Sequence, residues 1–189
     1  MPSYLVNPVF ESVSDRSVRK YRGDPVPLEL VREVIDAATY APSARRGEQW
    51  RFTVLSGEEK TRFIGFFRGE LNKIAAERGY QALGSALNSC EIMDQAPISI
   101  VVWNAGERGW LTEEHSVAAA MQNMLLRATD LGLGSLWIGD VYSVYEGIRA
   151  YFKKHWKLSG AIALGYPAEA GRDFRRKTVD EVTEWMMKN

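Results

Sequence analysis

Apolar residues recur every three or four positions in three long segments, which follow Pro27, Ser56 and Thr112. This spacing is typical of helices that bury one face. The second segment fills that face largely with phenylalanines, and such a stripe indicates a core rather than a cofactor contact. The inward positions are Leu28, Val31, Val34, Ile35 and Ala38 in the first segment, Phe63, Phe66, Phe67, Leu71 and Ile74 in the second, and Val117, Ala120, Met121, Met124, Leu125, Ala128 and Leu131 in the third.

Short sequence signals set the expected ends of the helices. Pro42 ends the first, because a proline disfavours helical geometry at the residue before it, and Gly79 and Gly132 end the other two. Thr112 is the expected cap of the third helix. Three Ser/Thr–x–x–Glu pairs predict capping boxes, in which two side chains satisfy free backbone N–H groups. These pairs are Ser56 with Glu59, Ser143 with Glu146, and Thr178 with Glu181.

Four short segments read as strands: residues 51–55, 97–103, 133–139 and 159–164. Residues 97–103 are almost entirely apolar, so this strand is expected to be buried on both faces. Gly134 and Gly139 allow close approach to the backbone. Helices alternate with these strands, and the chain has no internal repeats. The sequence therefore predicts one domain, residues 1–189, in which helices are layered on a sheet.

The overall composition excludes several classes of protein. The 24 basic and 24 acidic residues cancel, so we expect neither a nucleic-acid partner nor a membrane partner. The longest apolar run is too short to span a bilayer, and the N-terminus lacks the pattern of a signal peptide. The single cysteine, Cys90, excludes an internal disulfide and fits a reducing compartment. We therefore expect a cytoplasmic protein without a metal site, since the two histidines show no ligand spacing either.

Two segments carry candidate binding groups. If Arg16, Ser17 and Arg19 converge, two guanidinium groups and a hydroxyl would surround one anion, and arginine suits phosphate because it donates paired hydrogen bonds. The alternative is a solvated basic turn. The second segment is the loop 41–52, because a loop between a helix and a strand is a common place for binding groups. The alternative there is a polar connector.

Four separated segments together resemble the flavin-dependent nitroreductase family. They occur in the family's order, and the similarity covers nearly the whole chain. They are residues 15–21 (Asp-Arg-Ser-Val-Arg-Lys-Tyr), 41–50 (Ala-Pro-Ser-Ala-Arg-Arg-Gly-Glu-Gln-Trp), 131–139 (Leu-Gly-Leu-Gly-Ser-Leu-Trp-Ile-Gly) and 163–167 (Ala-Leu-Gly-Tyr-Pro), the last followed by a basic loop.

The resemblance implies an α+β fold, a three-layer α/β/α sandwich around a central, mainly antiparallel sheet. It also implies an intimate homodimer with two FMN molecules, each of which lies at the subunit interface. Residues 178–189 would then form a tail that packs on the partner subunit. The apolar residues Val182, Trp185, Met186 and Met187 in this tail need a surface to cover. The alternative is that they dock on their own core.

The resemblance also implies a role for individual residues. The first segment and a cation after the fourth would hold the FMN phosphate. The end of the third segment would lie against the isoalloxazine with a backbone N–H facing N5, and the loop 41–50 would approach from the partner subunit. No side-chain acid or base is needed for hydride transfer itself. The phosphate residues are Arg16, Ser17 and Arg19, with Arg175 or Arg176, of which we favour Arg176. The isoalloxazine residues are Ile138 and Gly139, and the loop residues are Pro42, Ser43, Ala44 and Arg46.

This chain departs from the family pattern at the first two segments. Asp15 replaces the usual Arg, Arg46 replaces a common Asn, and Glu48-Gln49 replaces Gln-Pro. Reduction places negative charge on the N1–O2 edge of a flavin, so a cation at Arg46 would stabilise the reduced form. The alternative is that Arg45, Arg46 and Glu48 form a surface ion-pair cluster.

The expected activity is that of an FMN-dependent oxidoreductase. It would take hydride from NADH or NADPH and reduce a small electron-poor acceptor, such as a nitroaromatic or a quinone, in a ping-pong cycle. One alternative is a specialised member of the family that fragments flavin, dehalogenates, or uses another electron donor. Another is a non-catalytic flavin-binding protein on the same fold. The preference between NADH and NADPH cannot be read from the sequence, because the family has no Rossmann fingerprint.

Overall fold

The computed structural model describes residues 17–169 and 175–187. Its helices are α2 (Leu28–Thr39), α3 (Gly57–Arg78), α4 (Ala86–Gln95), α5 (Leu111–Asp130), α6 (Tyr145–Tyr151) and α7 (Val179–Val182). Its strands are β1 (Trp50–Ser56), β2 (Ile98–Asn104), β3 (Gly134–Ile138) and β4 (Lys157–Gly165). Three short 3-10 helices complete it: η2 (Ala44–Arg46), η3 (Tyr80–Leu83) and η4 (Asp140–Val144).

The strands form one sheet in the order β1-β2-β4-β3, and every neighbouring pair is antiparallel. β2 lies inside this sheet, and all of its residues are buried. Its burial on both faces confirms the prediction from its apolar run. β1 and β3 are the two edges, a placement that decides where the functional segments lie.

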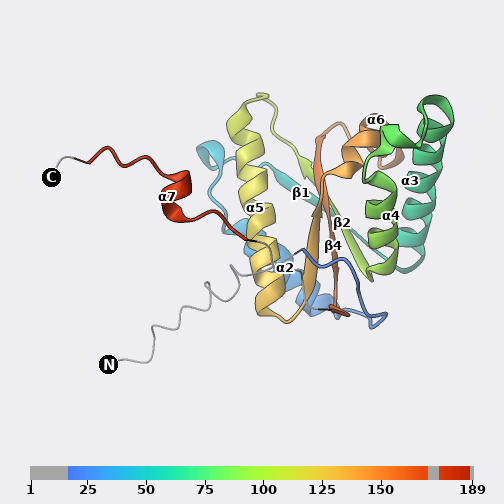
Figure 1. The fold of residues 1–189 in the computed structure, drawn as a ribbon, viewed down its shortest axis with the longest axis horizontal. Helices are drawn as coiled ribbons and strands as arrows, with labels where there is room; N and C mark the ends of the chain where they lie inside the picture. Colours follow the sequence, from blue (N-terminus) through green and yellow to red (C-terminus); the bar gives the residue numbers. More distant parts are fainter. Residues whose placement is uncertain (1–16, 170–174, 188–189) are drawn as a thin grey trace.

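Helices cover both faces of the sheet (Figure 1). α2 and α5 pack on one face, where Val34 and Met121 join one core cluster. α3, α4 and α6 cover the other face, where Phe63 and Phe67 of α3 are fully buried. Because these side chains are buried, the phenylalanine stripe belongs to the core, as predicted. Burying a side chain of this size contributes about 1.5–3 kcal/mol to the stability of the fold. The three-layer sandwich with an antiparallel sheet is confirmed. None of the described helices is long and apolar enough to cross a membrane.

Some helix ends follow the sequence signals. Gly79 ends α3 with φ of 82°, a left-handed conformation that glycine adopts without steric penalty. Thr178 and Glu181 form the predicted capping box of α7. α2 ends at Thr39, three residues ahead of Pro42, so the chain leaves helical geometry slightly before the proline requires it.

One predicted cap is right in position only, and two are wrong. Ser56 ends β1 and is the N-cap residue of α3, as predicted, but its side chain makes no cap hydrogen bond to α3. Ser143 lies inside η4, and α6 begins later, at Tyr145. α5 begins at Leu111, with Trp110 rather than Thr112 at its cap, because Glu113 accepts a hydrogen bond from the Trp110 N–H at 3.2 Å. In α5 and α6, the segment that precedes the helix lies outside the local pattern and sets the first helical residue.

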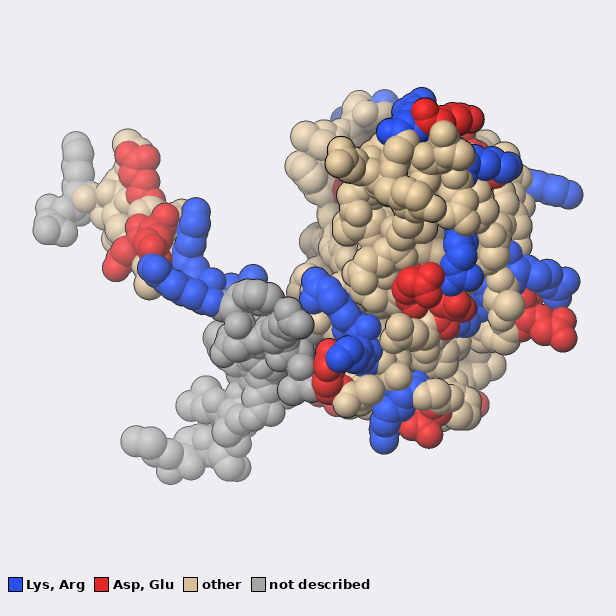
Figure 2. Space-filling model, turned by 45° about the vertical axis from the view of Figure 1, so that its right-hand side comes forward, with Lys and Arg blue, Asp and Glu red and all other residues tan. Residues whose placement is uncertain are grey.

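Residues 175–187, here called the C-terminal arm, extend away from the body of the subunit (Figure 1). Figure 2 shows basic residues on the arm next to the body and acidic residues farther out, around α7. Its large apolar side chains are exposed, from 61% for Trp185 to 89% for Met186. These side chains do not dock on their own core, so the alternative of intrachain docking is not realised here.

Candidate functional site

Three of the four segments singled out in the sequence meet along β3. The Val18 N–H donates a hydrogen bond to the Ser135 carbonyl at 3.0 Å, so the first segment lies against the outer edge of β3. The Arg22 N–H donates to the Tyr166 carbonyl at 2.9 Å, and Tyr21 forms a β-bridge with Pro167. Residues that are more than 110 positions apart in the sequence are therefore neighbours at one edge of the sheet.

Two glycines of these segments are required by this packing. A Cβ atom on Gly134 would lie 2.7 Å from Val18 Cγ2, and one on Gly165 would lie 2.5 Å from Pro97 Cδ and 3.0 Å from Tyr21 Cδ1. Real Cβ atoms do not approach other atoms so closely. Any larger residue at Gly134 would push the first segment away from β3, which explains this glycine in physical terms.

The first segment presents Ser17 and Arg19 at the surface. The Arg19 guanidinium donates to the Ser17 carbonyl at 3.2 Å and forms no ion pair with a described residue. The predicted partner Arg16 lies outside the described residues. On the arm, Arg175 pairs with Glu181 at 3.0 Å, whereas Arg176 pairs with no described carboxylate. Of these two arginines, only Arg175 therefore has an ion-pair partner among the described residues.

The end of β3 presents backbone rather than side chain. Ile138 is 2% exposed and packs in the core, so only its backbone can contact a ligand. Gly139 is exposed, and a Cβ built on it would meet nothing closer than the Tyr142 ring at 3.9 Å. A flat group can therefore approach the backbone of Gly139. The Tyr142 N–H donates to the Gly139 carbonyl at 3.0 Å and closes the turn.

Sequence reasoning missed Tyr142 and Asp140 in this turn. The Asp140 carboxylate accepts hydrogen bonds from Ser85 and Ser89, at the start of α4. The Tyr142 ring is 49% exposed beside Gly139, and desolvation, followed by the charge of Glu114, raises the pKa of its hydroxyl. The only sequence signal is their position directly after the third segment.

The loop before β1 is held by its own polar groups and by α5. The Ala44 N–H donates to Ser116 Oγ at 2.9 Å, and the Glu48 N–H donates to Ser43 Oγ at 3.2 Å. The Gln49 amide donates to the Ala44 carbonyl at 3.0 Å. The loop is therefore a built structure and not a loose polar connector.

This loop has a strained backbone. Arg45, Arg46 and Glu48 have φ angles of 54°, 57° and 44°, in the left-handed region that costs a residue with a Cβ about 1–2 kcal/mol. The buried Gln49 Oε1 has no hydrogen-bond partner among the described residues. Strain and orphaned polar atoms concentrate at functional sites. Arg46 and Glu48 form no ion pair with each other or with another described residue, so the ion-pair cluster considered above is not realised.

The loop and the β3 segments lie at opposite edges of the sheet. The loop leads into β1, and Gly139 follows β3, with β2 and β4 between them. Strands are spaced about 4.8 Å apart, so roughly 14 Å separates the two edges. A single chain therefore brings three of the predicted binding segments together and leaves the fourth, with Pro42, Ser43, Ala44 and Arg46, on the far side.

The described residues hold no other obvious reactive centre. No group of three or more His, Cys, Asp and Glu side chains in them is arranged to bind a metal ion. Cys90 is fully buried, and its burial raises the pKa of the thiol to about 11. A thiol with such a pKa is a poor nucleophile at neutral pH, because the thiolate is the reactive form.

Known proteins resemble this chain over most of its length. Residues 14–166 match the nitroreductase family. A protein of Methanothermobacter thermautotrophicus, named as a candidate NADH dehydrogenase/NAD(P)H nitroreductase, is 35% identical over 171 residues, which cover 85% of this chain and 78% of that protein. Iodotyrosine deiodinase 1 of Rattus norvegicus is 27% identical over 186 residues, covering 88% of this chain and 65% of that protein.

Solved structures give the same result for the fold. The crystal structure of a nitroreductase with bound FMN from Bacteroides fragilis NCTC 9343 matches with a TM-score of 0.76 and 29% identity. The match covers 97% of this chain and 100% of the other. The family match spans the segment that docks on β3, the strained loop, and β3 itself. This chain belongs to the nitroreductase family.

Proposed function

We propose that this protein is an FMN-dependent oxidoreductase that takes hydride from NADH or NADPH and reduces a small electron-poor acceptor, such as a nitroaromatic or a quinone, in a ping-pong cycle. Family membership supports an NAD(P)H-dependent oxidoreductase. The observation that carries the proposal is the meeting of three segments on β3. There Arg19, which forms no ion pair with a described residue, and the open backbone of Gly139 lie beside the same strand.

The residues at this edge fit FMN chemically. Bound FMN would supply the group that accepts and donates hydride. The guanidinium groups of Arg19 and Arg176 and the hydroxyl of Ser17 suit a phosphate, and the exposed Gly139 backbone suits a flat ring system. The strained loop contributes Arg46, whose charge would stabilise negative charge on the pyrimidine edge of the flavin.

In this proposal the site is completed by a second copy of the chain, as a homodimer. The separation of Pro42, Ser43 and Ala44 from Gly139 across the sheet supports this, because the two sets lie at opposite edges of the sheet and a second subunit can bring its own loop to the Gly139 edge. The C-terminal arm supports it as well. Its exposed apolar side chains are the kind of surface that a soluble chain buries against a partner.

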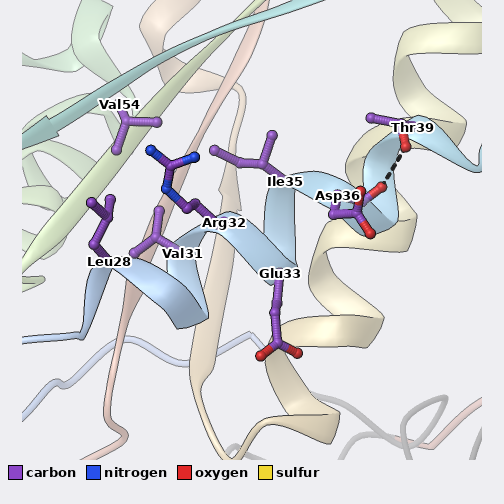
Figure 3. Close-up of a pocket in the computed structure, with 8 residues that line it drawn as sticks. All are labelled: Leu28, Val31, Arg32, Glu33, Ile35, Asp36, Thr39 and Val54. Atoms are coloured by element: carbon purple, nitrogen blue, oxygen red, sulfur yellow. Dashed lines mark hydrogen bonds between the residues drawn. The ribbon is translucent and has the colours of Figure 1, made fainter.

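A groove between α2 and β1 offers a docking place for the partner's arm (Figure 3). Leu28 and Val31 of α2 point towards Val54 of β1, and the groove has a volume of about 650 Å³. β1 is an edge strand, with backbone groups free to pair with an added strand. Beyond α7 the arm is extended, with φ of −127° and ψ of 130° at Thr183, which suits such pairing. The groove is lined by Leu28, Val31, Arg32, Glu33, Ile35, Asp36, Thr39 and Val54.

The test is anaerobic stopped-flow mixing of the purified protein with NADH and with NADPH. We expect bound FMN, loss of its absorbance on mixing, and recovery when a nitroaromatic or a quinone is added. FMN that neither nucleotide reduces at a useful rate would overturn the proposed activity and favour a non-catalytic flavin-binding protein.

The second candidate is a specialised member of the family. The similarity to a deiodinase supports keeping it. Recovery of oxidised flavin with an iodinated phenol, but not with a nitroaromatic or a quinone, would favour it. We also assign the protein to the cytoplasm, a proposal supported by its single, unpaired Cys90.

A further inference from the structure

Two arginines lie against one tryptophan beside the strained loop. The guanidinium carbons of Arg45 and Arg108 lie 5.0 Å and 4.7 Å from the centroid of the Trp110 ring. Both arginines are exposed. An arginine in this position is attracted to the negative face of the ring. Because both guanidinium groups lie against one ring, their separation is at most the sum of these two distances.

No described carboxylate neutralises these two charges. Six other arginines in the described chain form ion pairs with Asp or Glu, whereas Arg45, Arg46 and Arg108 form none. The nearby Glu113 is buried, and its carboxylate accepts hydrogen bonds from the backbone N–H groups of Arg108 and Trp110. It therefore fixes the position of Trp110 and leaves the guanidinium groups free for a ligand.

The backbone of Arg45 carries a conformational penalty to hold this position. Its φ of 54° is left-handed, and the hydrogen bonds of Ala44 to Ser116 and Gln49 anchor the residue before it. A strained residue whose side chain makes no ion pair is typical of a binding site in which the strain places the side chain.

We propose that Arg45 and Arg108 bind the 2′-phosphate of NADPH, and that this contact makes the protein prefer NADPH to NADH. A phosphate monoester carries a charge of about −1.5 to −2 and three acceptor oxygens, which matches two guanidinium groups. NADH has a hydroxyl at this position. The inference rests on the proposed function, because it takes a nicotinamide dinucleotide as the donor. Arg46, the next residue, is the one proposed to approach the flavin, so this subsite borders the donor site.

The direct test uses fragments that carry no nicotinamide. Calorimetric titration of the FMN-loaded protein with 2′,5′-ADP and with 5′-AMP separates the 2′-phosphate from the rest of the nucleotide. We expect 2′,5′-ADP to bind at least about tenfold more tightly, the effect of a charge-assisted hydrogen bond. Arg45→Asn and Arg108→Gln should each remove most of that difference and leave 5′-AMP binding unchanged. Asparagine is chosen at Arg45 because it tolerates a left-handed φ.

Arg78→Gln is the matched control, because it removes one exposed charge at the far end of α3. Equal losses for both fragments would show that the arginines bind a shared phosphate, and would overturn the assignment to the 2′-phosphate. If Arg45→Asn and Arg108→Gln lose no more of the preference for 2′,5′-ADP than the control does, the proposed subsite is wrong. If Arg45→Asn is unstable by its thermal melt, Arg108→Gln alone decides the question, because the same comparison applies to it.

Failure of this inference is distinguishable from failure of the proposed function. If neither nucleotide reduces the flavin, the proposed activity fails, but fragment binding still tests the subsite. If NADH and NADPH reduce the flavin equally well and 2′,5′-ADP shows no preference, the subsite fails and the activity stands.

Discussion

Ser89 Oγ donates a 2.5 Å hydrogen bond to the carboxylate of Asp140. Ser85 donates to both oxygens of the same carboxylate at 2.9 Å. These bonds join the start of α4 to the turn that follows Gly139. The position of that turn, and of the exposed backbone beside it, therefore depends on a carboxylate more than 50 residues away from its donors.

Replacing Asp140 with Ala should destabilise the fold and loosen the turn. Hydrogen bonds to a charged group contribute about 1.5–3 kcal/mol, so we expect the free energy of unfolding in urea to fall by that amount. FMN affinity should also fall, because Gly139 loses its support. Asp24→Ala is the control, since it removes a carboxylate from an exposed pair with Arg22, for which we expect about 0–1 kcal/mol. Equal effects of the two substitutions would show that the Asp140 contacts carry no stability.

Arg19→Ala should weaken FMN binding by about 1.5–3 kcal/mol, the range for a charge-assisted hydrogen bond. Quenching of flavin fluorescence on binding to the apoprotein gives the dissociation constant. Lys20→Ala is the matched control, because Lys20 is the adjacent cation but pairs with Glu169 at 2.9 Å. A dissociation constant in Arg19→Ala that equals the wild-type value would remove Arg19 from the site.

Arg46 should raise the midpoint potential of the flavin. A net stabilisation of about 1.4 kcal/mol shifts a two-electron potential by about 30 mV. Arg46→Asn should therefore lower the midpoint potential by tens of millivolts. Asparagine is chosen because it tolerates the φ of 57° at this position. FMN binding should weaken less than in Arg19→Ala. Spectroelectrochemical titration of wild type, Arg46→Asn and Glu48→Gln tests this, and matching potentials in all three would show that Arg46 does not tune the flavin.

Truncation after Lys177 should weaken the dimer. It removes Trp185 and Met186, which are exposed in the single subunit, and sedimentation velocity at micromolar concentration should show a larger monomer fraction. Val54→Glu, in the groove beside α2, should act in the same direction. Tyr80→Ala is the control, because Tyr80 is 72% exposed elsewhere. A wild-type protein that sediments only as monomer contradicts the homodimer.

Cys90 should make the folded state less stable at alkaline pH. Burial raises the pKa of its thiol from 9.0 to about 11, so between these values the unfolded chain releases a proton that the folded chain retains. The stabilising contribution is therefore present below pH 9 and is lost, by up to about 2–3 kcal/mol, as the pH rises through 11. Urea unfolding of wild type and Cys90→Ala from pH 8 to 10.5 isolates this term. At pH 8 a thiol reagent should modify Cys90 only after denaturation; fast modification of the native protein would contradict its burial.

Local sequence patterns specify the main helices and the buried strand, and they also identify the family. Periodic apolar residues specify α2, α3 and α5, and the apolar run 97–103 specifies the buried β2, because burial on a regular element repeats with the period of that element. Gly79 and the Thr178–Glu181 pair mark ends that depend only on local backbone geometry. The four resembling segments likewise identified the family before any contact was known.

Which residues meet depends on the three-dimensional packing of these elements. Val18 lies on β3 because of Gly134, and Asp140 accepts from Ser89, although neither pair has a spacing that a local pattern encodes. The order β1-β2-β4-β3 separates the strained loop from Gly139, and this separation is a property of the whole sheet. The left-handed Arg45 and its contact with Trp110 likewise depend on hydrogen bonds that backbone N–H groups donate to side chains of α5. Local periodicity reports which faces are buried, whereas these relationships depend on what each face is buried against.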